Sequence, residues 1–184
     1  MTQAEDLSFF FDSDADATQD VSAASVDHAS AQYLIFSVSK LEMAVALACV
    51  SEIVPYERVS VVPRAPEYVR GVVRVRGRVI PVLDLAIKLG MPPEVATKRT
   101  CILMLELELA AKRMPVGVVI DGLAKLLDVE LALISPAPRF STGVDVKFVE
   151  GLLPTERGML SLIDLQQVFA SDELAEVHSI DGAS

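Results

Sequence analysis

The sequence predicts an all-β fold made of two similar β subdomains, with a few short helices. Residues 33–170 form a succession of short runs rich in Val, Ile and Leu, separated by Pro, Gly and charged residues, which is typical of strands joined by turns. Sequence motifs also recur about 80 positions apart within this region. A length of 184 residues is sufficient for one domain or two small ones.

The apolar runs predict the positions of the strands. In chain order these are residues 33–38, 43–47, 69–85 as a hairpin, 101–107, 116–121, 123–129, 147–153 and 159–163. Val50, Ile53 and Val54 are apolar at a spacing of three or four, which predicts a brief helical turn at that point. Residues 107–111 fit either a strand or a helix, so both alternatives stay open.

Two aspartates predict the starts of two short helices. Asp84 is suited to N-cap a helix over residues 85–89, which Gly90 and the prolines after it would end. Asp164 is suited to N-cap a second helix over residues 165–170.

A weak internal repeat supports the two subdomains. The matching pairs are Val69-x-Gly71 with Val149-x-Gly151, Leu83-Asp84-Leu85 with Ile163-Asp164-Leu165 and, with a slip of one residue, Arg76-Gly77 with Arg157-Gly158. The first two pairs lie 80 positions apart. Each copy is therefore predicted to be a hairpin whose second strand is followed by an Asp-capped helical turn.

The formal charge of −10 is concentrated at the two ends of the chain. Residues 1–32 contain seven acidic residues and residues 172–184 contain four, and neither segment has a Lys or Arg. Removing these from −10 leaves +1 for residues 33–171. We expect residues 1–32 to form a disordered acidic tail. We expect residues 172–184 to form an acidic C-terminal tail, and Ser171 with the acids after it could cap a short helix through about residue 177.

An aromatic cluster interrupts the acidic N-terminal segment. It consists of Leu7, Phe9, Phe10 and Phe11, and so includes three of the seven phenylalanines of the chain. Two interpretations stay open: a sticky terminus, or a short docking peptide flanked by acids.

The sequence gives little support for catalysis, a metal site or a cofactor. Both histidines, His28 and His178, lie in the flanking segments, so residues 33–171 lack the commonest general base and metal ligand. Cys49 and Cys101 stand in apolar runs and are predicted to be buried thiols. An enzyme that uses paired acids among Asp84, Asp121 and Asp164 is a weak alternative, because capping or turn formation already explains these residues. We therefore expect a non-enzymatic protein.

The longest apolar run, residues 43–50, is far shorter than the roughly 20 residues that span a bilayer. The chain also lacks the pattern of a secretory signal peptide. We expect a cytoplasmic protein without direct membrane insertion.

The most informative segment is the arginine hairpin, residues 64–85. Arg64, Arg70, Arg74, Arg76 and Arg78 fall within fifteen positions, and the only acid among them is at position 67. The strand period of two places residues 73 and 75 toward the core and residues 74 and 76 outward, and the glycine at 77 permits a tight turn. The segment is either a solvated strand face or a binding surface, because arginine is frequent among interface hot spots.

Over residues 33–170 the sequence resembles the CheW-like coupling proteins of bacterial chemosensory arrays. The motifs that carry the resemblance are Tyr33-Leu34-Ile35-Phe36, Val50-x-Glu52-Ile53, Pro63-x-Ala65-Pro66-x-Tyr68-Val69-x-Gly71-Val72, Arg76-Gly77-x-Val79-Ile80-Pro81-Val82-Leu83-Asp84-Leu85, Val116-Gly117-Val118-Val119-Ile120-Asp121-Gly122, Ile134-x-Pro136-Ala137-Pro138 and Val149-x-Gly151. The resemblance implies two five-stranded SH3-like β-barrels on a shared hydrophobic core. Arg74-Val75-Arg76-Gly77 departs from the Asn-Leu-Arg-Gly that is usual in the family.

The resemblance also implies a function and two partners. Family members are adaptors that bind the regulatory domain of the histidine kinase CheA and the helical hairpin tip of a chemoreceptor, which would place this protein at membrane receptor arrays. The matching positions imply a receptor-binding set of Val50, Glu52, Gly71 and Arg76. They imply, more loosely, a kinase-binding set of Lys40, Leu41, Arg74 and Arg78.

Two alternatives to this function stay open. One is a CheW-like scaffold in a non-flagellar pathway, such as a pilus or surface-sensing system. The other, of a different class, is a small-barrel nucleic-acid-binding module that uses the arginine hairpin. The scarcity of aromatic residues near the hairpin argues against it, because single-strand binding platforms usually stack bases on aromatic rings.

Overall fold

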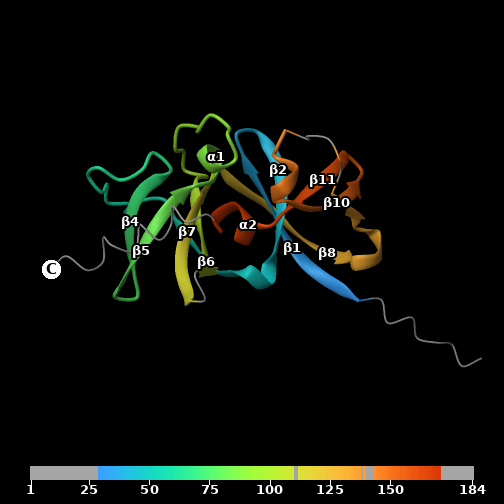
Figure 1. The fold of residues 1–184 in the computed structure, drawn as a ribbon, viewed down its shortest axis with the longest axis horizontal. Helices are drawn as coiled ribbons and strands as arrows, with labels where there is room; N and C mark the ends of the chain where they lie inside the picture. Colours follow the sequence, from blue (N-terminus) through green and yellow to red (C-terminus); the bar gives the residue numbers. More distant parts are fainter. Residues whose placement is uncertain (1–28, 110–111, 138, 140–142, 171–184) are drawn as a thin grey trace, which may run out of the picture.

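The computed structural model describes residues 29–109, 112–137, 139 and 143–170, which form two β-sheets side by side (Figure 1). One sheet contains β1 (Ser30–Val38), β2 (Leu41–Ala46), β8 (Gly122–Glu130), β9 (Ser135–Pro136), β10 (Val149–Thr155) and β11 (Gly158–Ile163). The other contains β3 (Val50–Pro55), β4 (Val69–Val75), β5 (Arg78–Asp84), β6 (Cys101–Leu109) and β7 (Lys112–Ile120). The short helices are α1 (Leu85–Lys88) and α2 (Leu165–Phe169). The predicted all-β fold is confirmed.

The two sheets exchange strands between the two halves of the chain. The six-stranded sheet has the order β8-β1-β2-β11-β10-β9, and the five-stranded sheet has the order β3-β6-β7-β5-β4. β1 and β2 thus join strands from the second half, while β6 and β7 join strands from the first half. A parallel pair makes each junction: β2 with β11, where Met43 faces Ser161, and β5 with β7, where Leu83 faces Val118. Each subdomain therefore contains strands from both halves.

The internal repeat corresponds to a repeated structural unit. The hairpins β4–β5 and β10–β11 each have a register shift next to a glycine, Gly71 and Gly151 respectively. Each hairpin ends at an aspartate that caps the following helix. The Asp84 carboxylate accepts a hydrogen bond from the Ile87 N–H at 3.0 Å, and the Asp164 carboxylate accepts one from the Gln167 N–H at 3.1 Å. Both predicted caps are confirmed.

A shared hydrophobic core lies between the two sheets, as expected. It contains fully buried side chains from strands of both sheets and from both helices, including Phe36, Leu83, Leu103 and Phe169. Each sheet also encloses a smaller cluster of its own, with Ile35 at the centre of one and residues such as Ile102 in the other. Because each large aliphatic or aromatic side chain contributes about 1.5–3 kcal/mol when buried, the shared core is the main attachment between the subdomains.

One local prediction differs from the structure, and one open alternative is decided by it. The predicted helical turn at residues 50–54 is wrong: these residues form β3, which pairs antiparallel with β6, and a 3₁₀ turn lies just before it at Leu47–Cys49. The three-residue spacing was misleading because the side chains of β3 alternate between half-buried and exposed, as period two requires. Residues 107–111 were left open between strand and helix, and β6 continues as a strand to Leu109.

β1 begins at Ser30, inside the segment that was predicted to be disordered, and its first residues pair with the end of β8. Residues 1–28 and 171–184, with the aromatic cluster, both histidines and the predicted C-terminal helix, lie outside the described residues. No helix in the described part of the chain is long and apolar enough to cross a membrane.

Gly71 holds the first residues of β4 against a neighbouring loop. Ser60 and Val72 exchange two backbone hydrogen bonds of 2.8 Å, which bring the Ser60 carbonyl oxygen directly over Gly71. A methyl group at position 71 would lie 2.2 Å from this oxygen, and the backbone there has a φ of +144°. Only glycine satisfies both the close approach and this backbone conformation.

We predict that Gly71→Ala lowers the free energy of unfolding by about 3 kcal/mol or more, because strain of the backbone adds to the clash with Ser60. Gly90 is the matched control, since it also has a positive φ (+74°) but open space around it. Gly90→Ala should cost only about 1–2 kcal/mol. Urea denaturation of the two variants measures the difference, and equal losses would show that the contact with Ser60 is unimportant.

Candidate protein-binding site

Glu52 and Arg76 of the implied receptor-binding set form an ion pair across the surface of the five-stranded sheet. Glu52 lies on β3, and Arg76 lies in the turn between β4 and β5. The Arg76 Nη2 and Glu52 Oε2 atoms are 3.2 Å apart, and the two side chains are 80% and 35% exposed. An ion pair this exposed contributes about 1 kcal/mol or less to stability. Arg76 therefore keeps donors available for a carboxylate on a partner.

The β4–β5 turn raises Arg76 above the sheet. Arg76 and Gly77 both have positive φ, at 50° and 79°, as the central residues of a type I′ hairpin turn do. Arg74 and Arg78 stand on the two strands below the turn, and both are exposed. Neither forms an ion pair with any described residue. The end of the hairpin is thus a cationic surface in which a single arginine is neutralised.

The structure gives the other two residues of the receptor-binding set different positions. Gly71 is buried under Ser60, so its role is structural and it offers no surface of its own. Val50 begins β3 and packs, half-buried, against the shared core. Glu52 and Arg76 are therefore in contact with each other, while Val50 and Gly71 support the strands that carry them.

A groove lies between the two sheets, where the family resemblance implies a receptor groove, but its lining residues were not predicted from the sequence. This inter-sheet groove has a volume of about 360 Å³, and its lining residues include Ile53, Val54, Lys98, Arg99 and Leu123. Ile53 on β3 and Leu123 on β8 are 40% and 37% exposed, unusual for large apolar side chains on strands. From the sequence alone these two residues look like core residues. Their exposure depends on which strands form the edges of the sheets, and a local sequence pattern does not show this.

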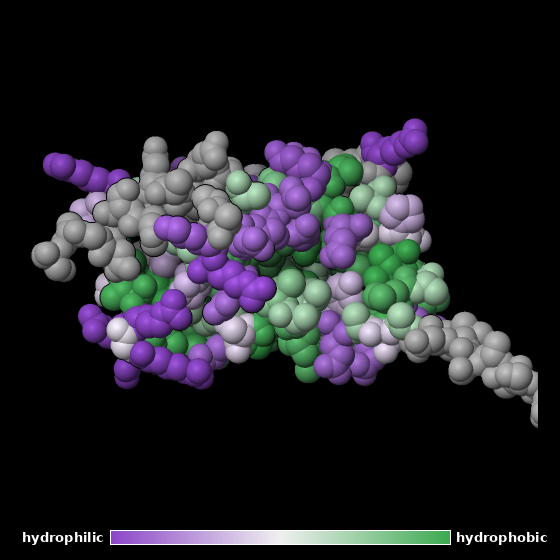
Figure 2. Space-filling model, turned by 60° about the horizontal axis from the view of Figure 1, so that its bottom comes forward, coloured by the Kyte–Doolittle hydropathy of each residue, from purple (hydrophilic) through white to green (hydrophobic). Residues whose placement is uncertain are grey.

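Hydrophobic residues are also visible from the lower side of the molecule. Figure 2 shows that this side carries them in separate groups, divided by hydrophilic side chains. On the side shown, the described residues therefore form several small apolar patches in place of one continuous apolar face.

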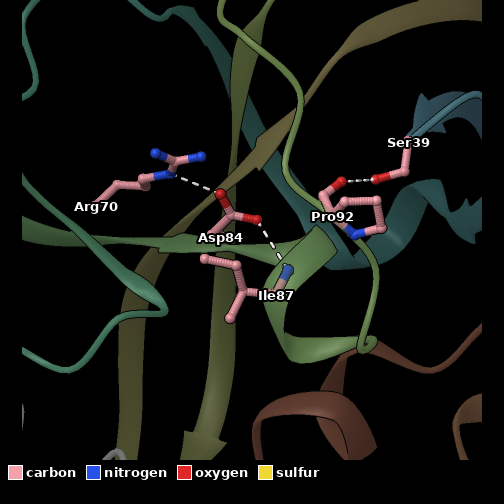
Figure 3. Close-up of polar contacts among 5 residues, drawn as sticks. All are labelled: Ser39, Arg70, Asp84, Ile87 and Pro92. Carbon is pink, nitrogen blue, oxygen red and sulfur yellow. Dashed lines mark hydrogen bonds and ion pairs between the residues drawn. The ribbon is translucent and has the colours of Figure 1, made fainter.

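Lys40 and Leu41 of the implied kinase-binding set lie far from Arg74 and Arg78. They form the β1–β2 turn of the six-stranded sheet, where Lys40 pairs with Glu94 at 3.7 Å and Leu41 is 39% exposed. The preceding Ser39 hydroxyl donates to the Pro92 carbonyl oxygen in the loop after α1 (Figure 3). This turn is thus at the α1 end of β5, whereas Arg78 is at the other end of that strand, roughly 20 Å away for seven residues. The kinase-binding set forms two separate surfaces.

The acids that an enzyme would need are already used for structure. Asp84, which is 3% exposed, caps α1 and also accepts a 2.6 Å hydrogen bond from the Arg70 Nε (Figure 3). Asp121 accepts a hydrogen bond from the Ser39 N–H at 2.7 Å, and Asp164 caps α2. Among the described residues, no group of three His, Cys, Asp or Glu side chains is arranged to hold a metal ion.

The two cysteines differ in environment. Cys101 is buried as predicted, but Cys49 is exposed, because the 3₁₀ turn before β3 carries it to the surface. Partial burial of the Cys49 thiol raises its pKa, and the negative charges of Asp164 and Glu150 raise it further. Since the thiolate is the nucleophilic form, Cys49 is poorly suited to react at neutral pH.

The nucleic-acid alternative receives no support from the aromatic residues of this region. Tyr68 at the start of the hairpin is half-buried, and the ammonium group of Lys88 lies 3.9 Å from the centre of its ring. Tyr56 is also half-buried and packs against the small cluster of the five-stranded sheet. These rings are therefore already engaged, and bases could not stack on them freely.

Comparisons with a family model, with individual proteins and with a solved structure agree with one another. The model of the CheW-like domain family matches residues 32–173. The "Probable chemotaxis protein CheW" of Rhizobium etli is 30% identical over 149 residues, which cover 81% of this chain and 94% of that protein. The "Chemotaxis protein CheW" of Rhizobium meliloti is 32% identical over 142 residues, or 77% of this chain and 89% of that protein. The crystal structure of the scaffolding protein TtCheW from Thermoanaerobacter tengcongensis superimposes with a TM-score of 0.69 at 24% identity, covering 79% of this chain and 91% of that chain.

We predict that Arg70→Leu destabilises the protein by about 3 kcal/mol, because it leaves the Asp84 carboxylate buried without its cation. The double variant Arg70→Leu, Asp84→Asn should recover part of this loss, since an amide can replace the buried charge and still accept the cap hydrogen bond. Urea denaturation measures both. If the loss in the free energy of unfolding of the double variant equals the sum of the losses of Arg70→Leu and Asp84→Asn alone, the unpaired buried charge is not the cause of the instability.

We also predict that Ellman's reagent modifies Cys49 more slowly than free cysteine at pH 8, because the raised pKa lowers the thiolate fraction. The rate should increase only as the pH rises above the usual range of a thiol. A Cys101→Ser background isolates the signal, and Glu150→Gln should accelerate the reaction because it removes one of the charges that raise the pKa. A rate equal to that of free cysteine would contradict the prediction.

Proposed function

Because the chain belongs to the CheW-like domain family, we propose that it is a non-enzymatic adaptor that couples chemoreceptors to the histidine kinase CheA in a chemosensory signalling array. Its partners would be the cytoplasmic tip of a chemoreceptor and the regulatory domain of CheA. Such a role requires binding surfaces and no catalytic group. It would place the protein in the cytoplasm, at membrane receptor arrays.

The receptor interaction is proposed from the inter-sheet groove, whose lining includes Ile53, the residue that follows Glu52 on β3. A helical hairpin presents apolar side chains along one face with charged residues beside them, and such a face fits a groove with apolar walls and a charged rim. Ile53 and Leu123 provide the exposed apolar side chains of the groove, and Lys98 and Arg99 provide basic groups in its lining. Glu52 and Arg76 do not line the groove, and they add one exposed charge of each sign on the same strand and the neighbouring turn.

Within this proposal the implied receptor-binding residues have two kinds of role. Glu52 and Arg76 would contact the receptor directly, whereas Val50 and Gly71 would keep β3 and β4 in the positions that the contact needs. The proposal extends the receptor-binding set to Ile53 and Leu123.

An adaptor also needs a second surface that stays accessible when the first is occupied. The β1–β2 turn with Lys40 and Leu41 meets this need, since it lies at the opposite end of β5 from the arginine hairpin turn. Arg74 and Arg78 lie close to Arg76, so a kinase that used them would compete with the receptor for space. We therefore place the kinase contact at Lys40 and Leu41 in preference to Arg74 and Arg78. The same geometry suits a non-flagellar CheW-like scaffold equally well.

We predict that Arg76→Glu weakens receptor binding by about 30-fold or more, which corresponds to roughly 2 kcal/mol, because a repulsive charge replaces a hot-spot arginine. Co-sedimentation of the purified protein with receptor-containing vesicles measures the affinity, and circular dichroism checks that the fold is intact. Lys40→Glu is the matched control, since it reverses an exposed charge at the far end of β5 and should leave receptor binding unchanged.

The double variant Glu52→Arg, Arg76→Glu separates a direct contact from a structural effect. It restores an ion pair with the charges exchanged. If Arg76 acts only by pairing with Glu52, the double variant should bind the receptor normally. A direct contact instead predicts that binding stays weak, and wild-type affinity in Arg76→Glu alone would rule out the assignment.

A further inference from the structure

A second groove lies on the six-stranded sheet, away from the site described above. This β8 groove has a volume of about 710 Å³, roughly twice that of the inter-sheet groove. Its apolar lining includes Ile35, Leu127 and Leu160, of which Ile35 and Leu160 belong to the buried core of this sheet at 5% and 6% exposure. Its charged lining residues are Glu42, Lys125, Glu156 and Arg157. The groove therefore combines a buried apolar floor with a charged rim of zero net charge.

The repeat explains why this groove is open. In the five-stranded sheet, the outer strand β3 is connected to the β4–β5 turn by the Glu52–Arg76 ion pair. In the six-stranded sheet, the outer strand β8 corresponds to β3, and the β10–β11 turn corresponds to the β4–β5 turn. There, however, Lys125, Glu156 and Arg157 form no ion pair with any described residue. No side-chain bridge closes this groove.

Further apolar surface continues toward the point where the described chain begins. Leu131 and Leu133 are 44% and 53% exposed in the 3₁₀ turn after β8. The N–H of Leu131 donates to the carbonyl oxygen of Ala29, the first described residue, at 2.9 Å. Figure 2 shows hydrophobic side chains beside the place where the described residues meet the N-terminal segment. This apolar surface therefore lies next to Ala29, the first described residue.

We propose that the β8 groove binds the aromatic cluster of this protein's own N-terminal segment, residues 7–11. The segment supplies one leucine and three phenylalanines, the chemistry that an open apolar groove requires. Eighteen residues separate Phe11 from Ser30. A flexible linker of this length spans roughly 23 Å, whereas Leu127 faces a β1 residue only three positions beyond Ser30, about 10 Å along the strand. The cluster can therefore reach the groove.

The charges specify how the cluster lies in the groove. Asp6 and Asp12 flank the aromatic residues. These acids favour the sides of the rim formed by Lys125 and Arg157, and they are repelled by Glu42 and Glu156. Because the rim has no net charge, apolar burial supplies most of the affinity and the charges set the orientation. The cationic arginine hairpin has a stronger attraction for the acids, but its exposed Arg74, Arg76 and Arg78 do not line either the inter-sheet groove or the β8 groove.

The absence of tryptophan from the chain allows a direct test. In full-length Phe10→Trp, the single indole should emit at shorter wavelength and be quenched by acrylamide several-fold less than in a free peptide of residues 1–28 that carries the same substitution. Leu127→Asp, checked for folding by circular dichroism, should restore quenching to the level of the free peptide. The exposed pair Lys125→Glu, Arg157→Glu should also increase quenching without involving a core residue. Arg74→Glu, Arg78→Glu is the matched control and should change nothing.

Three results would overturn the proposal. Quenching in the full-length protein equal to that of the free peptide would show that the cluster is not buried. Protection that decreases on dilution would show that the cluster binds a second copy of the chain. Protection that is lost in the Arg74, Arg78 variant but kept in both groove variants would place the segment on the arginine hairpin.

Discussion

The exchange of strands between the two halves of the chain is the constraint on which the rest of the structure depends. Each sheet needs the first hairpin of the other half, and the parallel pairs β2–β11 and β5–β7 are where these hairpins join. The exchange leaves β3 and β8 as outer strands of different sheets, and the inter-sheet groove is lined from both of them. The surface proposed to bind the receptor is therefore a consequence of the topology as much as of the residues on it.

The two repeats share a backbone plan but have diverged in chemistry, which gives the molecule two distinguishable ends. Arg70 neutralises the capping Asp84 in the first repeat, whereas Glu150, 80 positions later, is one of two acids that raise the pKa of Cys49. The turn of the first hairpin is cationic, while the turn of the second carries one charge of each sign. A partner can therefore recognise one end and reject the other, although the folds are alike.

Local signals predicted most of the fold and only part of the site. β-branched runs, capping aspartates and the paired glycines identified most of the strands and both α-helices, because each signal acts within a few residues, and β3 is the exception. The strand exchange and the exposure of Ile53, Leu123 and Cys49 depend on which strands become neighbours, and no local pattern encodes this. For the same reason, Glu52 and Arg76 were implied by the family resemblance as members of one set, while only the structure shows that they touch.

The parallel pairing of Met43 with Ser161 also affects how the protein is synthesised. At roughly 5–20 residues per second, a ribosome needs about 6–24 s to proceed from one of these residues to the other. During this time β2 lacks its partner β11, and β1 lacks its partner β8 until residues 122–130 have been made. The six-stranded sheet can therefore be completed only after most of the chain has been synthesised.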